Sequence, residues 1–173
     1  MTALYFITRF LTFPGALTRG VWEHIVCKIC GIPVENNRLL RADELCSHVE
    51  HELAPTSRKA FLVCFVPAFM NGLLAFFLSM PAIIGYFYFE MASVENTVIS
   101  LISYWFAFSL FVNSYPTIED ALNMKEKVYK EGTILQKFFY IPGFAVCYIG
   151  AFLEKYLVTF LLAVAGLVYL ISL

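Results

Sequence analysis

Residues 60–80, AFLVCFVPAFMNGLLAFFLSM, carry no charged side chain and are long enough to cross the hydrocarbon core of a bilayer as one helix. The uncharged stretch continues to Phe89, and Pro81 predicts that a longer helix tilts or bends there. Residues 97–115 and 156–173 are also uncharged and of spanning length. Residues 137–155 are marginal and fit a fourth span, a re-entrant piece or an interfacial helix. The sequence therefore predicts an all-α, polytopic integral membrane protein with three to four transmembrane helices.

The composition of the 173 residues agrees with this class of protein. Of these residues 60% are hydrophobic and only 14% are charged, which lies outside the range of an ordinary soluble domain. The net charge of -1 gives no basic surface for nucleic acid. The first partner that the composition predicts is the lipid bilayer.

Basic residues are placed unevenly along the chain, and their placement predicts orientation. None lies between 81 and 96, whereas eleven of the 12 gather before the first span and after the second: Arg9, Arg19, Lys28, Arg38, Arg41, Arg58, Lys59, Lys125, Lys127, Lys130 and Lys137. Lys and Arg are retained on the cytoplasmic side of a membrane. We therefore expect a multi-pass protein of the cytoplasmic membrane, with residues 1–59, including the amino terminus, and the loop 117–137 in the cytoplasm.

Two regions follow from this pattern. Residues 60–173 form the transmembrane domain, and residues 1–59 form an amphipathic or half-inserted helix followed by a cytoplasmic segment rich in Cys and His. The first residues are apolar but contain Arg9, Arg19 and a Pro-Gly break at 14 and 15, so the arginines are expected to face lipid phosphates. They lack a basic leader and a small-residue cleavage site, so a removable signal peptide is not expected.

The cytoplasmic segment offers possible metal ligands. Cys27 and Cys30 form a CxxC followed by Gly31, and Cys46 and His48 follow at a spacing compatible with a zinc site closed by four ligands. His51 competes with His48 for the position of the fourth ligand. The alternative is an apolar helix, VWEHIVCKIC, in which both thiols fill small hydrophobic positions. Zinc is the only cofactor that the sequence suggests.

Two further motifs stand on consecutive helices. FVPAFMNGLLAFF contains Pro67 and Asn71, and FVNSYPTIEDA contains Asn113, Pro116 and Asp120. With GIPVE before them, their order resembles the site-2 protease family of intramembrane metalloproteases over about residues 18–122. The resemblance implies a zinc ion held between an HExxH helix and Asp120. Asp120 also fits a second role, because acidic residues in the first turn of a helix after a proline cap it.

The metal helix departs from the family pattern. GVWEH, residues 20–24, stands where HExxH is expected, so His24 alone is retained, while Gly20 and Val21 replace the first histidine and the catalytic glutamate. We therefore expect no ordinary HExxH proteolysis. Two sets of residues can stand in for the lost groups: His24, Cys27, Cys30, Cys46, His48, His51 and Asp120 as metal ligands, and Glu23, Glu50 and Glu52 as the base.

Two functions stay open on the sequence. The first is a membrane scaffold or partner-binding subunit of site-2-protease-like architecture, which docks a protein partner or a second copy of itself through the cytoplasmic segment and is not an enzyme. The second is an active zinc-dependent intramembrane protease with a rearranged metal site.

Overall fold

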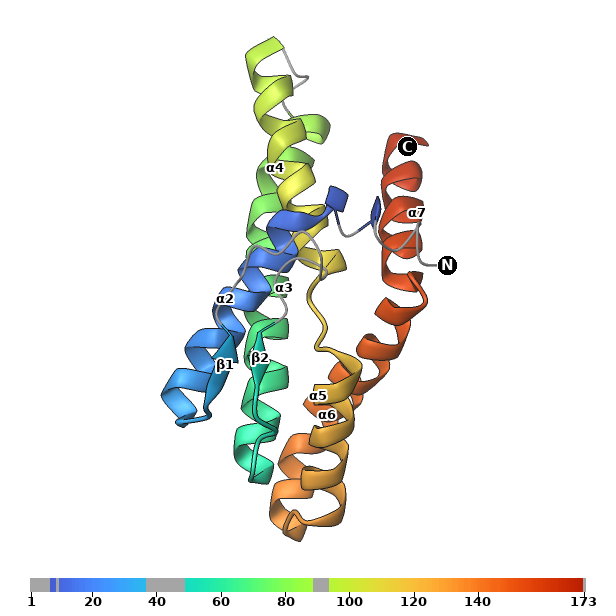
Figure 1. The fold of residues 1–173 in the computed structure, drawn as a ribbon. Coiled ribbons are helices and arrows are strands. Elements are labelled where there is room, and N and C mark those ends of the chain that lie inside the picture. The colour runs from blue at the N-terminus through green and yellow to red at the C-terminus, as the bar shows by residue number, and fades with distance from the viewer. Residues whose placement is uncertain (1–6, 9, 37–48, 89–93, 173) are drawn as a thin grey trace.

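A computed structural model describes residues 7–8, 10–36, 49–88 and 94–172 (Figure 1). The protein is mostly helical, as the sequence predicts. The elements with their bounds are α2 (Phe13–Cys30), β1 (Val34–Asn36), β2 (Glu50–His51), α3 (Ser57–Tyr88), α4 (Val94–Val112), α5 (Ile118–Lys125), the π-helical turn η1 (Glu126–Lys130), α6 (Ile134–Lys155) and α7 (Val158–Ser172).

Two helical stretches are long and apolar enough to cross a membrane, Ser57–Met80 in α3 and Ile134–Glu154 in α6, and a shorter apolar stretch runs from Val98 to Val112 in α4. The uncharged run at 60–80 thus forms part of one long helix, and α3 continues through Pro81 to Tyr88. The marginal run at 137–155 lies within the single helix α6, which contains Pro142. Length and composition therefore allow α6 to span a membrane.

Helix α2 packs against both α3 and α4, which lie side by side (Figure 1). At Gly15 the approach to α4 is so close that an added Cβ would lie 2.0 Å from the Ser109 carbonyl oxygen. The Gly15 backbone N–H donates to Ser109 Oγ at 2.7 Å, and Asn71 Nδ2 of α3 donates to the Gly15 carbonyl at 3.0 Å. Only glycine permits this approach, because the opposing atoms belong to backbone that cannot rotate away.

The same crossing is fastened by polar groups of α4. Ser109 Oγ and Asn113 Nδ2 both donate to the Thr12 carbonyl, at 2.8 and 3.0 Å. Asn71 Nδ2 also donates to the Asn113 carbonyl at 3.2 Å. Asn71, Ser109 and Asn113 are fully buried. Interhelical hydrogen bonds of this kind fix which helices pair within a bundle.

Helix α2 ends at Gly31, which adopts the left-handed conformation with φ 62°. The Gly31 and Ile32 N–H groups donate to the Lys28 and Cys27 carbonyls and so close the last turn. Both cysteines of the CxxC therefore belong to one continuous helix. Cys27 is fully buried in an apolar cluster with Val26, Ile32 and Cys64.

After Gly31 the chain enters a short antiparallel ladder in which Val34 pairs with His51 and Asn36 with Glu50. This two-stranded ladder is an addition to the all-α architecture that the sequence predicts. Its strands are only two and three residues long, so they give no alternating pattern to detect. The ladder fixes the position of His51 relative to α2.

The last third of the chain begins with α5, which is capped by Thr117, and continues with α6, which begins with a capping box formed by Thr133 and Gln136. Helix α5 packs on α3 and α6, and α7 packs on α4. Leu157, between α6 and α7, has φ 57°, so the chain changes direction there. In Figure 1, α7 runs beside the α4 end of the bundle, whereas most of α6 lies toward the opposite end.

Candidate functional site

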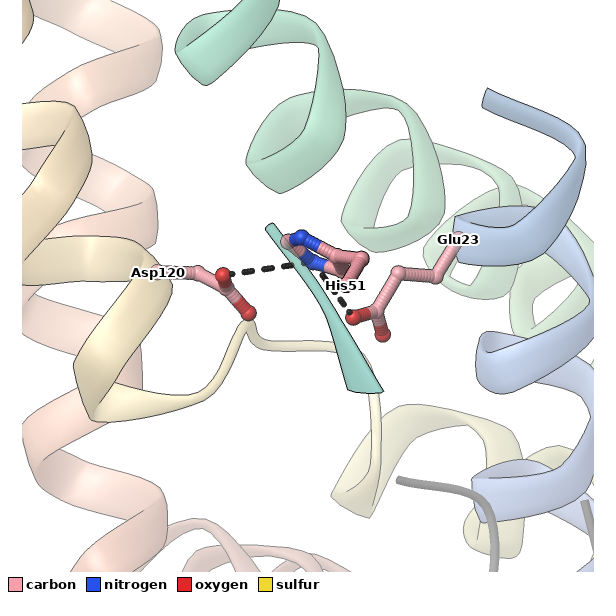
Figure 2. A group of neighbouring side chains, drawn as sticks. All are labelled: Glu23, His51 and Asp120. Atoms are coloured by element: carbon pink, nitrogen blue, oxygen red, sulfur yellow. Dashed lines mark ion pairs between the residues drawn. The ribbon is translucent and has the colours of Figure 1, made fainter. Parts of the chain in front are cut away.

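Three side chains from three different elements converge in the interior: Glu23 of α2, His51 of β2 and Asp120 of α5 (Figure 2). His51 Nε2 lies 3.3 Å from Glu23 Oε1 and 3.4 Å from Asp120 Oδ1. The three side chains are at most 8% exposed. Charged groups at this depth require partners, because an isolated charge taken out of water costs several kcal/mol, on the order of the whole stability of a small domain.

Asp120 is held in place by the start of its own helix. The Asp120 N–H donates to Thr117 Oγ1 at 3.2 Å, and the Thr117 hydroxyl donates to Asp120 Oδ2 at 2.6 Å. One carboxylate oxygen of Asp120, Oδ2, therefore takes part in capping the helix, as one interpretation of the sequence predicts. The other oxygen, Oδ1, faces His51. Burial, followed by the charge of Glu23, raises the pKa of Asp120, while His51 and the Thr117 hydrogen bond oppose that rise.

His51 is oriented by a backbone group. Its Nδ1 lies 2.8 Å from the Glu52 carbonyl oxygen. Because a carbonyl only accepts, Nδ1 carries a proton and donates it there, which leaves Nε2 to face the two carboxylates. The neighbouring Glu23 carboxylate, together with the charge of Asp120, raises the pKa of His51 to about 9, although burial acts in the opposite direction.

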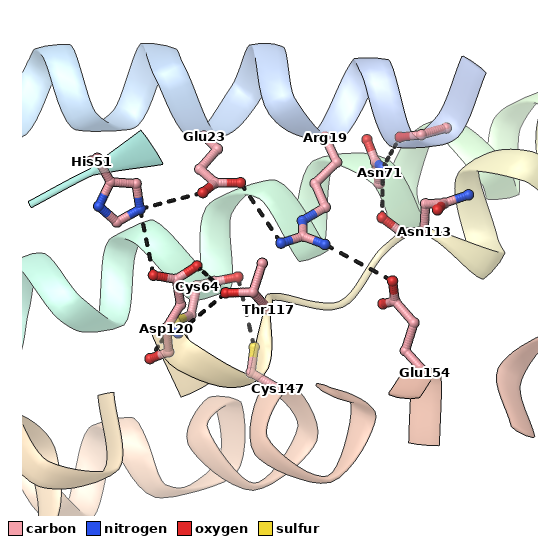
Figure 3. A network of polar contacts seen from close by, with 11 residues as sticks. Arg19, Glu23, His51, Cys64, Asn71, Asn113, Thr117, Asp120, Cys147 and Glu154 are labelled. Atoms are coloured by element: carbon pink, nitrogen blue, oxygen red, sulfur yellow. Dashed lines mark hydrogen bonds and ion pairs between the residues drawn. The ribbon is translucent and has the colours of Figure 1, made fainter. Parts of the chain in front are cut away.

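A second cation belongs to the same network (Figure 3). Arg19, one helical turn before Glu23, places Nη2 3.7 Å from Glu23 Oε2 and Nη1 3.9 Å from Glu154 Oε1 of α6. Arg19 and Glu154 are buried as well. The network thus joins α2, β2, α5 and α6, and it connects the two halves of the chain through charge.

A pocket of about 190 Å³ adjoins the group on the side of the β1–β2 ladder. His51 and Asp120 form part of its wall, and the other lining residues are Glu35, Val49, Glu50, Leu53, Thr117 and Glu119. Four of the lining side chains are carboxylates, so the pocket favours cations over anions.

The residues that the sequence suggests as ligands are placed very differently. Within the described part of the chain, Glu23, His51 and Asp120 are the group of His, Cys, Asp and Glu side chains close enough to share one ion. His24 is half-buried outside that group. Cys30 is also half-buried, and Cys46 and His48 lie outside the described residues.

Cys27 lies in the apolar core rather than at the polar centre. Burial raises the pKa of its thiol to about 12, with a further contribution from the charge of Glu23. A thiol in these surroundings stays protonated at neutral pH in the metal-free protein.

The three candidate bases are also separated. Glu23 lies inside the group, and Glu50 lines the adjoining pocket. Glu52 is exposed and contributes its backbone carbonyl to His51.

Two members of the network, Arg19 and Glu154, are not among the sequence candidates. The signal for Arg19 was its spacing, because residues four apart share a helix face, and Arg19 and Glu23 form such a pair. Glu154 gives only a weak signal, as a single acid near the end of an apolar helix.

Comparison of the chain with protein-family models, with curated proteins and with solved structures gives no match.

Proposed function

We propose that this chain is an integral membrane protein of site-2-protease-like architecture that does not hydrolyse peptide bonds by the HExxH mechanism and acts as a membrane scaffold or partner-binding subunit. The proposal rests on the identity of the α2 residues that belong to the same network as Asp120. These residues are Arg19 and Glu23, which lie one helical turn apart and take part in the ion pairs around His51.

This arrangement lacks the groups that hydrolysis needs. A hydrolytic zinc site requires an open coordination position and a carboxylate beside the zinc-bound water. Residues 19–23 read RGVWE, so in this register a guanidinium occupies the first histidine position and Gly20, without a side chain, occupies the position of the base. The sequence suggested residues 20–24 instead, but in the structure it is Glu23, rather than His24, that shares the centre with Asp120.

Placement in a membrane is supported by the surface of the helices. Only 28% of the apolar window in Ser57–Met80 and 17% of that in Ile134–Glu154 is buried inside the protein, whereas a core helix of a soluble protein is mostly buried. Large side chains such as Phe69, Phe76 and Phe77 point outward. An apolar surface of this extent requires lipid or a partner to cover it.

One observation favours the alternative, a protease with a rearranged metal site. Glu50 lines the pocket that His51 and Asp120 also line, so a carboxylate is present beside the group. The pocket and the group are then the parts of an active centre in which His51 replaces the missing histidines.

The test is cleavage of a single-span substrate reconstituted with the full chain in proteoliposomes containing Zn²⁺. The wild-type chain should leave the substrate intact. A variant R19H/G20E/E23H places the HExxH set at 19–23, facing Asp120, and should bind zinc and gain cleavage if the architecture is that of the protease family. The matched control G20H/V21E places the set at 20–24 and should remain inactive.

Each outcome of this test is informative. Zinc-dependent cleavage by the wild-type chain, lost in D120N, would refute the proposal and favour the rearranged protease. Gain of activity by the control but not by R19H/G20E/E23H would show that the register is 20–24. Circular dichroism of both variants checks that the helices are retained.

A further inference from the structure

We propose that Glu23, His51 and Asp120 form a binding site for one divalent transition-metal ion, with Glu23 Oε1, His51 Nε2 and Asp120 Oδ1 as protein ligands. The inference concerns the centre on which the proposed function also rests, and it adds a ligand to that centre. It requires no hydrolytic activity.

The two distances from His51 match the separation of ligands around one ion, and all three ligand atoms lie within 4.8 Å of one another. Nitrogen and oxygen ligands lie about 2.0–2.2 Å from zinc, so two ligands of a tetrahedral ion lie roughly 3.3–3.6 Å apart. His51 Nε2 is 3.3 Å from Glu23 Oε1 and 3.4 Å from Asp120 Oδ1. Hydrogen bonds between charged groups are shorter, about 2.7–2.9 Å.

An unsatisfied atom points at the same place. Glu23 Oε1 is completely buried, and among the described residues its one close polar neighbour is His51 Nε2 at 3.3 Å, which is longer than a well-formed charged hydrogen bond. A buried carboxylate oxygen without a well-formed hydrogen bond carries a desolvation cost. An ion bound between Glu23 and His51 would remove this cost.

The surroundings hold each ligand as metal-binding proteins do. A ligating histidine usually donates its other N–H to a carbonyl or carboxylate, and ligating carboxylates are themselves hydrogen-bonded. His51 Nδ1 donates to the Glu52 carbonyl, and Asp120 Oδ2 accepts from Thr117. The two ligand atoms that remain, His51 Nε2 and Asp120 Oδ1, face each other.

Charge balance supports a divalent ion. Among the described side chains of the network, three carboxylates (Glu23, Asp120 and Glu154) carry -3 together, and Arg19 carries +1, so the sum is -2 when His51 is neutral. A divalent ion bound to the group brings the sum to zero. Arg19 contacts Oε2 of Glu23, so the oxygen that faces His51 stays available to the ion.

The adjoining pocket provides the route of entry and room for water as a further ligand. Its volume is about 190 Å³, and Glu35, Glu50 and Glu119 line it beside two of the ligands. Two carboxylates and one imidazole are borderline-hard donors, which suit Zn²⁺, Mn²⁺ and Fe²⁺. The site therefore differs from the thiolate-rich cluster that the CxxC motif suggested.

The test measures bound zinc on the full chain, purified in detergent without chelators or metal-affinity resin. After dialysis against Zn²⁺ and then against metal-free buffer, elemental analysis should find one zinc per chain. The variants E23Q, H51Q and D120N, which keep side-chain size, should each weaken zinc binding roughly tenfold or more in titration calorimetry. The matched controls H24Q and E131Q should bind as the wild type does, because neither side chain belongs to the group or lines the pocket.

A second measurement does not depend on the variants folding. X-ray absorption of the zinc-loaded wild type should show only nitrogen and oxygen neighbours. Absence of bound zinc, sulfur among its neighbours, or undiminished binding by all three ligand variants would each overturn the metal site. These results are separable from those of the proteolysis test. A chain that binds zinc without cleaving substrate supports both proposals. Absence of zinc refutes only the metal site, and zinc-dependent cleavage by the wild type refutes only the proposed function.

Discussion

Gly15 is the point where α2 and α4 come closest, and replacing it by alanine gives the sharpest test of the packing. The new Cβ would lie 2.0 Å from the Ser109 carbonyl oxygen, 2.3 Å from its carbon and 2.6 Å from the Leu110 nitrogen. Nonbonded carbon and oxygen atoms approach to about 3.3 Å at the closest. The two helices must therefore separate by roughly 1 Å, because all three opposing atoms belong to the backbone.

The cost follows from what the separation breaks. Overpacking of a well-packed interior costs about 1–3 kcal/mol. Three hydrogen bonds at the same level link Gly15 or Thr12 to Ser109 and Asn71. Each interhelical bond contributes about 0.6 kcal/mol in a membrane protein. We expect Gly15→Ala to lower the free energy of unfolding by about 3–5 kcal/mol, the sum of these effects.

Gly72 provides the control, because a Cβ there meets nothing within 4 Å. Gly72→Ala should raise stability by about 0.5–1 kcal/mol, since alanine loses less backbone freedom in a helix. Unfolding by SDS in mixed micelles can be followed by the fluorescence of Trp105, whose indole N–H donates to the Leu11 carbonyl beside the crossing. If the two alanine variants change stability by the same amount, the close approach at Gly15 is wrong.

Three further predictions concern charge. In metal-free protein, folding raises the pKa of His51 from 6.5 to about 9, so protonated His51 adds at most about 3 kcal/mol to the free energy of unfolding. This stabilisation is complete below pH 6.5 and is lost as the pH rises through 9. The unfolding free energies of wild type and H51Q should therefore converge across this pH range, and a constant difference between them would contradict the assignment. Arg19→Met strands two buried carboxylates and should cost about 3–5 kcal/mol in the same unfolding assay, with partial rescue by E154Q; absence of rescue would contradict the ion pair. In a cysteine-free background, an impermeant thiol reagent added outside the cell should label a cysteine at Ser93 but not at Lys125, and the reverse pattern would invert the topology.

The helices that pack mainly by apolar contact could be predicted from the sequence. The charge-free run at 60–80 identifies the centre of α3 because an uninterrupted apolar stretch of that length satisfies its backbone only as a helix when water is excluded. The two-stranded ladder could not be predicted, because its strands gain their stability from each other and from α2 rather than from local preference.

The candidate site was predictable only in part, for a geometric reason. His51 and Asp120 were among the candidate ligands, and the structure places them 3.4 Å apart. Residues 23 and 24 differ by one position along a helix, which is a rotation of about 100°, and only tertiary packing decides which of them faces inward. The partner of Arg19 depended likewise on the fold, because Glu154 meets it only when α6 returns to α2.

The polar network also imposes an order on how the chain is assembled. Glu23 and Arg19 are synthesised first, His51 follows after the ladder, and Asp120 and Glu154 arrive last, on α5 and α6. Until α5 and α6 dock, Arg19 lacks its contact with Glu154 and His51 lacks its contact with Asp120. Docking of α5 and α6 therefore completes the network, because Arg19 gains Glu154 and His51 gains Asp120 only in the assembled bundle. Forms that lack these contacts are expected to be less stable and more open to degradation.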